Sequence, residues 1–396
     1  MSLRFLLFIS VVFLSLNLSS HQRSESFSKW SITQSELDKS QVITTTFTVK
    51  LTVLAKMYPD LLGDWESRII KEVLEGFVLP DNCILSKDIE SFISNQNGSF
   101  NISWHYSCKE PIAEIDNNTF FDQDLSHSHI ARFTLDSMEL PEILFTASSR
   151  HTSLKMENDK SFQGTSFLDY LLLGLQHISS GFDHLAFLIG LILLNRRLKS
   201  LFIAVTGFTI GHSLTLVLGV LGFVTPMTNW VEAVIGFSIA LIALELILKE
   251  TGQTYFYLKC LSIFWGILFL LIFSLNINIS LMGLIGLSIF SLTYLYLVTI
   301  EKVRLSLFIT TLFGLVHGFG FGGYLSQVGF QESRFLNALL GFNLGVELGQ
   351  LLIIGFILFI SFIFNKKIMN LPSSFRPYMG CLLVGVGTFW FLERSF

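Results

Sequence analysis

The sequence predicts an α-helical polytopic membrane bundle of about eight transmembrane helices, preceded by an N-terminal, mostly β, exported domain. Three observations indicate this fold class. Of the 396 residues, 51% are hydrophobic and only 14% are charged, well below the roughly 25% of charged residues in soluble proteins. The apolar residues are concentrated after Phe167. Lys and Arg recur after every second apolar segment, as expected when alternate loops face the cytoplasm.

The chain divides into three parts. Residues 1–20 indicate a signal peptide, because Arg4 is followed by an apolar run that is too short for an ordinary membrane span. Residues 21–163 have the composition of a soluble domain, and residues 164–396 hold the membrane segments. We therefore expect a multi-pass protein of the cell (inner or cytoplasmic) membrane with its N-terminal domain outside. The formal net charge of −4 gives no indication of a nucleic-acid partner, and the oligomeric state is not indicated.

The N-terminal domain is predicted to be sandwich-like with one helix. Apolar residues at helical spacing place that helix at 61–78. Segments rich in Thr, Val and aromatic residues predict strands at 41–55, 99–108, 130–135, 142–148 and 153–157.

Two residue pairs in this domain each allow two interpretations. Cys83 and Cys108 form a disulfide if the domain is exported, or else remain two free thiols. His127 and His129 are two residues apart and therefore point the same way on a strand. They form either a metal-collecting pair or, as is more common, two solvated side chains.

Eight apolar segments follow, most of them near the roughly 20 residues that a spanning helix requires. The intervening loops 225–229 and 276–279 carry no basic residue and 329–334 carries one, whereas two or three basic residues follow each of the first, third, fifth and seventh segments. This alternation places both ends of the bundle outside. The predicted spans are 168–194, 201–224, 230–248, 258–275, 280–300, 305–328, 335–364 and 377–392.

Ionisable side chains lie inside several of these spans. At about 1.5 Å of rise per residue, His177, His212, His317 and Glu347 lie roughly 13–18 Å below the outer surface, and His184 lies deeper. Such groups are costly in a membrane and usually mark a functional pathway. Imidazole and carboxylate groups bind divalent transition metals, with Ni first and Zn or Co as alternatives. The candidate metal ligands are His177, Asp183, His184, His212, His317 and Glu347.

Some of these roles stay open at this point. On one continuous helix, His177 and His184 are two turns apart and share a face. Asp183 either binds the ion or orients a neighbouring imidazole. Each histidine taken alone could also be a hydrogen-bonded packing residue. Small residues at four-residue spacing, such as Gly341-x-x-x-Gly345, predict the close helix contacts that would let several helices share one ion.

The blocks that carry these residues resemble a known family. They are His177-Ile-Ser-Ser-Gly-Phe-Asp-His184, Phe208-Thr-Ile-Gly-His212, Phe313-Gly-Leu-Val-His317 and Phe342-Asn-Leu-Gly-Val-Glu347. In this order they resemble the HupE/UreJ family, which are hydrogenase and urease accessory membrane proteins regarded as nickel permeases. The resemblance covers roughly residues 164–364. It implies transition-metal handling, and it would carry the ligand role onto His177, Asp183, His184, His212 and His317.

Two functions follow from this pattern. In the first, the protein is a transporter: a metal ion enters from outside, meets the outer layer of histidines with Glu347, and passes His184 inward. In the alternative, it is an intramembrane hydrolase with a His-bound Zn-water, where Asp183 or Glu347 is the general base and Ser213 supports an oxyanion. A structural or sensing role centred on the exported domain is the remaining possibility. The expected partners are the metal ion and the lipid bilayer.

Overall fold

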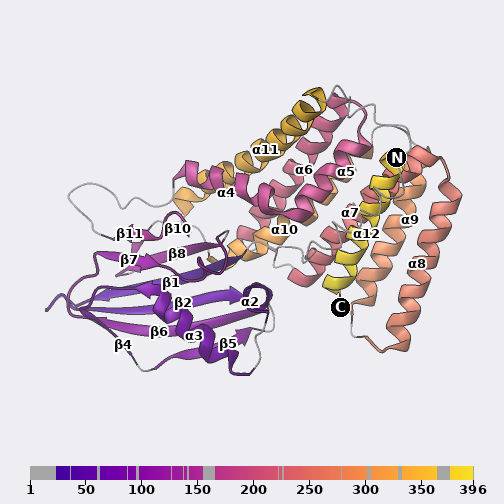
Figure 1. The fold of residues 1–396 in the computed structure, drawn as a ribbon. Helices are drawn as coiled ribbons and strands as arrows, with labels where there is room; N and C mark the ends of the chain where they lie inside the picture. Colours follow the sequence, from indigo (N-terminus) through magenta and orange to yellow (C-terminus); the bar gives the residue numbers. More distant parts are fainter. Residues whose placement is uncertain are drawn as a thin grey trace.

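The computed structural model describes residues 24–395, apart from positions 36, 60–62, 87, 95–97, 126, 137, 141, 155–165, 222, 225–226, 278, 301–304, 329–331 and 364–374. The predicted signal peptide, residues 1–20, lies outside the described residues. A β domain and a helical bundle lie against each other (Figure 1). This arrangement confirms the predicted fold class.

Two sheets build the β domain. The larger has the strand order β10-β8-β1-β2-β6-β4, with β5 paired to β6 and β9 paired to β8, and the smaller has the order β11-β7-β3. Both sheets contribute to one buried aromatic core around Trp30, Phe47 and Trp104. The strands are β1 (Glu25–Gln34), β2 (Gln41–Lys50), β3 (Phe77–Val78), β4 (Cys83–Leu85), β5 (Glu90–Ser94), β6 (Ser99–Cys108), β7 (Glu114–Asn117), β8 (Ser128–Leu135), β9 (Met138–Glu139), β10 (Ile143–Thr146) and β11 (His151–Ser153).

The described residues of the β domain form two helices where one was predicted. The predicted strand 41–55 is wrong beyond Lys50, because α2 (Leu51–Met57) begins there. The predicted helix 61–78 corresponds to α3 (Trp65–Gly76), which buries Ile69 and Val73 against the core. The Cys83–Cys108 disulfide is present and joins neighbouring strands β4 and β6.

Neither interpretation of His127 and His129 holds, since both rings are buried and hydrogen-bonded. Hydroxyls of Ser24, just before β1, and of Ser26 and Ser28 in β1 contact both nitrogens of each ring, at 2.5–2.8 Å. The chain of contacts ends where the indole nitrogen of Trp30 donates to Ser28 Oγ at 2.6 Å. Burial lowers the pKa of His129 well below its ordinary value. Burial therefore favours the neutral imidazole of His129, and its serine contacts join β1 to the parallel strand β8.

The bundle contains helices that match the eight predicted spans. Six of the described helices are long and apolar enough to cross a membrane, and a bent pair raises the number to seven. In α10, the described stretch Leu307–Gly320 is apolar but shorter than a full span. The helices are α4 (Phe167–Ser180), α5 (Phe182–Leu194), α6 (Leu198–Val220), α7 (Thr228–Thr251), α8 (Thr254–Ser274), α9 (Leu281–Ile300), α10 (Leu305–Val328), α11 (Glu332–Ile363) and α12 (Phe375–Ser395).

The first predicted span is broken, contrary to the expectation of one continuous helix. Helices α4 and α5 meet at an angle of 73°. Gly181 forms the break: its amide donates to the carbonyl of His177 at the end of α4, and α5 starts at the next residue. The two histidines of this segment therefore lie on different helices, His177 in the last turn of α4 and His184 in the first turn of α5.

Reciprocal glycines bring pairs of helices into backbone contact. A Cβ on Gly211 of α6 would lie 2.0 Å from the carbonyl oxygen of Thr311, and one on Gly314 of α10 would lie 2.0 Å from that of Phe208. On α11, Gly345 meets α4 in the same way. The predicted small-residue contacts are confirmed, and they set the distances between the helices that carry the histidines.

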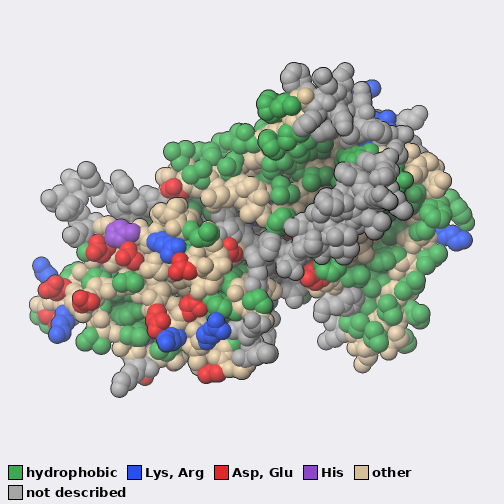
Figure 2. All heavy atoms as spheres, in the orientation of Figure 1, with side chains coloured by type: hydrophobic (Ala, Val, Ile, Leu, Met, Phe, Trp, Pro, Cys, Tyr) green, Lys and Arg blue, Asp and Glu red, His purple; other side chains and the backbone are tan. Residues whose placement is uncertain are grey.

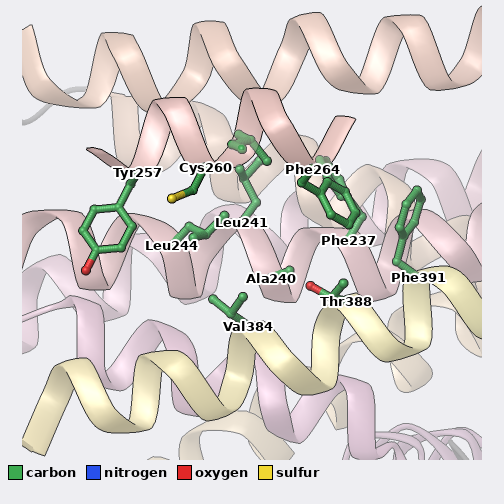
Figure 3. A pocket seen from close by; sticks show the side chains of 11 residues that line it. Phe237, Ala240, Leu241, Leu244, Tyr257, Cys260, Phe264, Val384, Thr388 and Phe391 are labelled. Carbon is green, nitrogen blue, oxygen red and sulfur yellow. The ribbon is translucent and has the colours of Figure 1, made fainter. Parts of the chain in front are cut away.

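Helices α8 and α9 form a hairpin beside this tight bundle (Figure 1). The hydroxyl of Tyr294 on α9 donates to Glu245 on α7, which also pairs with Lys249 at 2.5 Å. An apolar pocket of about 180 Å³ lies among α7, α8 and α12, between Tyr257 and Phe391 (Figure 3). The predicted Glu245–Lys249 ion pair is thus present, and its carboxylate also anchors the hairpin.

The β domain covers the end of the bundle where α4 begins and α12 ends. Phe27 and Ile130 belong to one buried cluster with Tyr170 of α4 and Phe342 of α11. The Tyr170 hydroxyl donates to Glu142 at 2.5 Å. In Figure 2, charged side chains gather on the β domain, whereas the visible face of the bundle is mainly hydrophobic. This division is what a water-exposed domain docked on a membrane-embedded bundle requires.

Candidate metal centre

Four buried histidines converge where α4, α5, α6 and α10 meet. Their exposed fractions are 9% for His177, 8% for His184, 0% for His212 and 1% for His317. The ring centroids of His177 and His184 lie 4.7 Å apart, and those of His184 and His317 lie 5.1 Å apart. The four rings therefore form one cluster, although they come from four helices and span 140 positions of sequence.

Three of the rings can face a single ion. His177, His184 and His212 each offer one ligand nitrogen, and these atoms lie within 4.8 Å of one another. Two nitrogens bound to one tetrahedral ion at about 2.0–2.1 Å are roughly 3.3 Å apart. The rings therefore need to close by no more than about 1.5 Å to share an ion, which side-chain rotation can supply.

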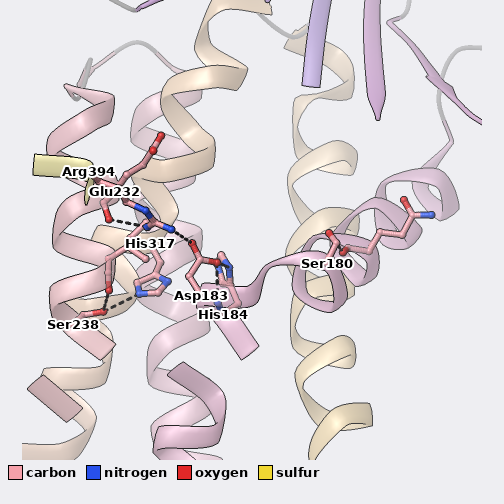
Figure 4. A network of polar contacts seen from close by, with 9 residues as sticks. Ser180, Asp183, His184, Glu232, Ser238, His317 and Arg394 are labelled. Carbon is pink, nitrogen blue, oxygen red and sulfur yellow. Dashed lines mark hydrogen bonds and ion pairs between the residues drawn. The ribbon is translucent and has the colours of Figure 1, made fainter. Parts of the chain in front are cut away.

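Asp183 orients His184. Its Oδ1 accepts hydrogen bonds from the backbone amide and from Nδ1 of His184, both at 2.9 Å (Figure 4). A proton on Nδ1 leaves Nε2 as the nitrogen that can bind a metal, and Nε2 has no hydrogen-bond partner among the described residues. Of the two roles predicted for Asp183, the geometry favours orientation of the imidazole.

The bend at Gly181 supports this arrangement. A Cβ at this position would lie 2.8 Å from His184 Nδ1 and 3.3 Å from Asp183 Oδ1. The expected greater depth of His184 is wrong, because it assumed a continuous helix. The bend returns the chain toward the other rings, so His184 contacts His177, His212 and His317 in one layer.

His317 lies beside the three-histidine group. Its Nε2 is 3.1 Å from Ser238 Oγ on α7, and its Nδ1 has no hydrogen-bond partner within the described part of the chain (Figure 4). Phe187 and Phe208 pack on its ring, with centroids 5.0 Å away. An apolar wall therefore covers one side of the ring, while the other faces His184.

His212 has the most enclosed ring of the cluster. Neither ring nitrogen has a hydrogen-bond partner of good geometry among the described residues, although Asn343 lies next to the ring. Three residues before it, Thr209 donates to Gln350 of α11 at 3.1 Å. A buried polar atom without a partner costs about 1–3 kcal/mol. A bound cation would remove that cost by accepting the nitrogen lone pair.

Glu347 does not belong to the three-histidine group. Its side chain is partly exposed on α11, between Val346, which packs on α4, and Gln350, which contacts α6. The predicted polar stripe on α11 is real, but Asn343 and Gln350 are the members that approach the His212 helix. The spacing of these residues correctly predicted that they share one face of α11, but it did not predict which of them approach α6.

Two groups near the cluster were not predicted. Arg394, in the last turn of α12, donates to the carbonyl of Glu232 at 2.9 Å and lies 3.8 Å from Asp183 Oδ2. Phe342 of α11 stacks on His212 with ring centroids 6.3 Å apart. Arg394 lies two residues beyond the predicted span 377–392, so the sequence pattern did not mark it as a group inside the bundle.

These features define a polytopic membrane protein with a buried histidine cluster inside its helical bundle. The family model described as HupE / UreJ protein matches residues 152–282 and 272–394, more than half of the chain. The chain therefore belongs to the HupE / UreJ family, and the resemblance in its histidine blocks is confirmed. No curated protein matches the sequence. Membership suggests a membrane role in nickel or cobalt accessory function or transport.

Proposed function

We propose that this protein moves a divalent transition metal, with Ni²⁺ as the first candidate, across the cell membrane through its histidine cluster. The observation that carries the proposal is the convergence of His177, His184 and His212, whose ligand atoms lie within 4.8 Å of one another in a buried layer. Family membership supports nickel or cobalt as the cargo. Co²⁺ and Zn²⁺ also bind imidazole, so the choice of metal depends on geometry and availability.

The donor set suits transfer better than permanent storage. It consists of neutral imidazoles, and the two free cysteines, Cys260 and Cys381, lie on the exposed surface. His317 lies 5.1 Å from His184 and offers a next position for an ion that leaves the three-histidine group. We place the β domain outside, because the loop charges and the predicted signal peptide both indicate that orientation. The ion would then enter at the end of the bundle that the β domain covers.

The hydrolase alternative has less support. Its oxyanion group was to be Ser213, whose hydroxyl instead donates to the carbonyl of Thr209 at 2.7 Å. Its general base was to be Asp183 or Glu347. Asp183 is held by His184 and Arg394, and Glu347 lies outside the three-histidine group.

Uptake of Ni²⁺ into proteoliposomes tests the proposal. We expect His212→Ala and His317→Ala to reduce uptake at least tenfold while the protein remains in the membrane. His105→Ala is a matched control, because this ring contacts Thr44 on the surface of the β domain. Wild-type uptake in both cluster variants contradicts transport through this site.

A further inference from the structure

We propose that the β domain is a working part of the metal site, in which Lys50 and Arg394 are positioning residues that hold His184 through Asp183. This inference rests on the proposed function. It assigns a task to the β domain, which the histidine cluster alone does not explain.

The first contact in this series joins the β domain to the helical bundle. Lys50, at the end of β2, places Nζ 3.9 Å from Glu232 Oε1 at the start of α7. Both side chains are mostly buried, with 12% and 15% exposed. Burial lowers the pKa of Lys50, while Glu232 and Glu25 act in the opposite direction. A lysine at such a junction needs its carboxylate partners to stay charged, so it links the domain to the position of Glu232.

The next contacts lead from Glu232 to the cluster. Its carbonyl oxygen accepts a hydrogen bond from Arg394 at 2.9 Å, and the other terminal nitrogen of Arg394 lies 3.8 Å from Asp183 Oδ2 (Figure 4). The guanidinium also lies over the ring of Trp390, 5.4 Å from its centroid. Its fixed plane therefore holds two groups at once, which a lysine in its place could not do.

Asp183 is the last residue in this series of contacts before His184. One of its oxygens faces Arg394, and the other accepts both hydrogen bonds from His184. The partner of a metal-binding imidazole sets its tautomer and its direction, and loss of such a partner typically weakens metal binding about 10- to 100-fold. A displacement of Glu232 thus reaches His184 through three contacts, and a displacement of Arg394 reaches it through two.

A second, apolar contact acts on the other rings. Phe27 and Ile130 of the β domain share a buried cluster with Phe342. The Phe342 ring lies 5.3 Å from that of His177 and stacks on that of His212. The β domain is therefore linked to groups that contact all three rings, through Glu232, Arg394 and Asp183 on the α7–α12 side and through the shared apolar cluster on the α11 side.

Equilibrium binding of Ni²⁺ to the purified full-length protein tests the polar route. We expect Lys50→Met to weaken binding about tenfold and Lys50→Arg, which restores the charge, to recover most of it. Glu232→Gln removes the carboxylate of the same ion pair and should weaken Ni²⁺ binding as much as Lys50→Met does. Lys71→Met is the control, since this lysine pairs with Glu75 on the exposed face of α3.

The visible absorption spectrum of a Co²⁺-loaded sample is a second measurement, which distinguishes a change in ligand geometry from a general loss of stability. The visible absorption of bound Co²⁺ depends on ligand geometry, so Lys50→Met should change its position or intensity, whereas Lys71→Met should not. Wild-type affinity and spectrum in both Lys50→Met and Glu232→Gln would overturn the inference. The proposed function would then stand, provided that His212→Ala still abolishes binding. If the wild-type protein binds no Ni²⁺, the proposed function itself fails.

Discussion

Gly211→Ala is the substitution that most severely tests whether helix contact sets the geometry of the histidine cluster. The added methyl would lie 2.0 Å from the carbonyl oxygen of Thr311 and 2.8 Å from the amide nitrogen of Leu315. Carbon atoms do not approach closer than about 3.0 Å in such contacts. Helices α6 and α10 therefore have to separate by about 1 Å, which moves His212 away from His317.

The expected cost follows from overpacking. Forcing a methyl into a filled contact costs about 1–3 kcal/mol. If all of that cost falls on the site, metal affinity drops by roughly five- to 150-fold, since 1.4 kcal/mol is a factor of ten. Isothermal titration of the purified protein with Ni²⁺ measures the affinity, and a thermal melt measures how much of the cost falls on stability.

Gly266→Ala is the matched control. No atom lies within 4 Å of a Cβ at this position in α8. The alanine should leave metal binding unchanged and stabilise the helix by up to about 1 kcal/mol. Equal affinities and equal melting temperatures for Gly211→Ala and Gly266→Ala would refute the claim that α6 and α10 are in backbone contact at the cluster.

Three further predictions concern the bend, the disulfide and acid stability. Gly181→Ala should displace His184 and weaken Ni²⁺ binding about tenfold; titration at wild-type affinity would contradict this. Replacing Cys83 and Cys108 by alanine should lower the free energy of unfolding of the β domain by about 3 kcal/mol, measured by urea unfolding followed through tryptophan fluorescence, and an unchanged midpoint would contradict it. His129 has a lowered pKa in the folded state, so the unfolded chain binds more protons below pH 6.5. Stability should fall as pH falls, by up to about 1.4 kcal/mol per unit, and a flat urea midpoint from pH 7 to 5 would count against this.

The membrane part was largely predictable because its signals are strong and local. Eight long apolar segments and alternating loop charges depend on composition alone. The break at Gly181 was missed because the apolar pattern continues across it. The Ser-Ser-Gly sequence before α5 was the available warning, since such residues interrupt helices in apolar segments.

The β domain was harder to predict, and β1 shows why. Ser24 just before the strand and its inward positions Ser26 and Ser28 are polar, so this segment lacks the alternation of apolar residues that identifies buried strands. Those serines face inward because they bind two histidines that lie about 100 positions later. The run from Leu51 is predicted as strand because its β-branched Thr52 and Val53 favour strands, and tertiary packing overrides that preference in α2.

The residues of the site could be predicted from the sequence, whereas their contacts with one another could not. The histidines stood out because ionisable groups are rare inside apolar spans. That Asp183 serves as a support, that Glu347 lies outside the group and that Arg394 reaches Asp183 all depend on helix rotation and on contacts between distant segments. No periodicity within one helix contains that information.

The metal content of the purified protein tests the central claim most directly. After loading with Ni²⁺ and removal of free ion, elemental analysis should find about one ion per chain in the wild type and in His105→Ala, and close to none in His212→Ala. Equal nickel in His212→Ala and the wild type would contradict a site built from His177, His184 and His212.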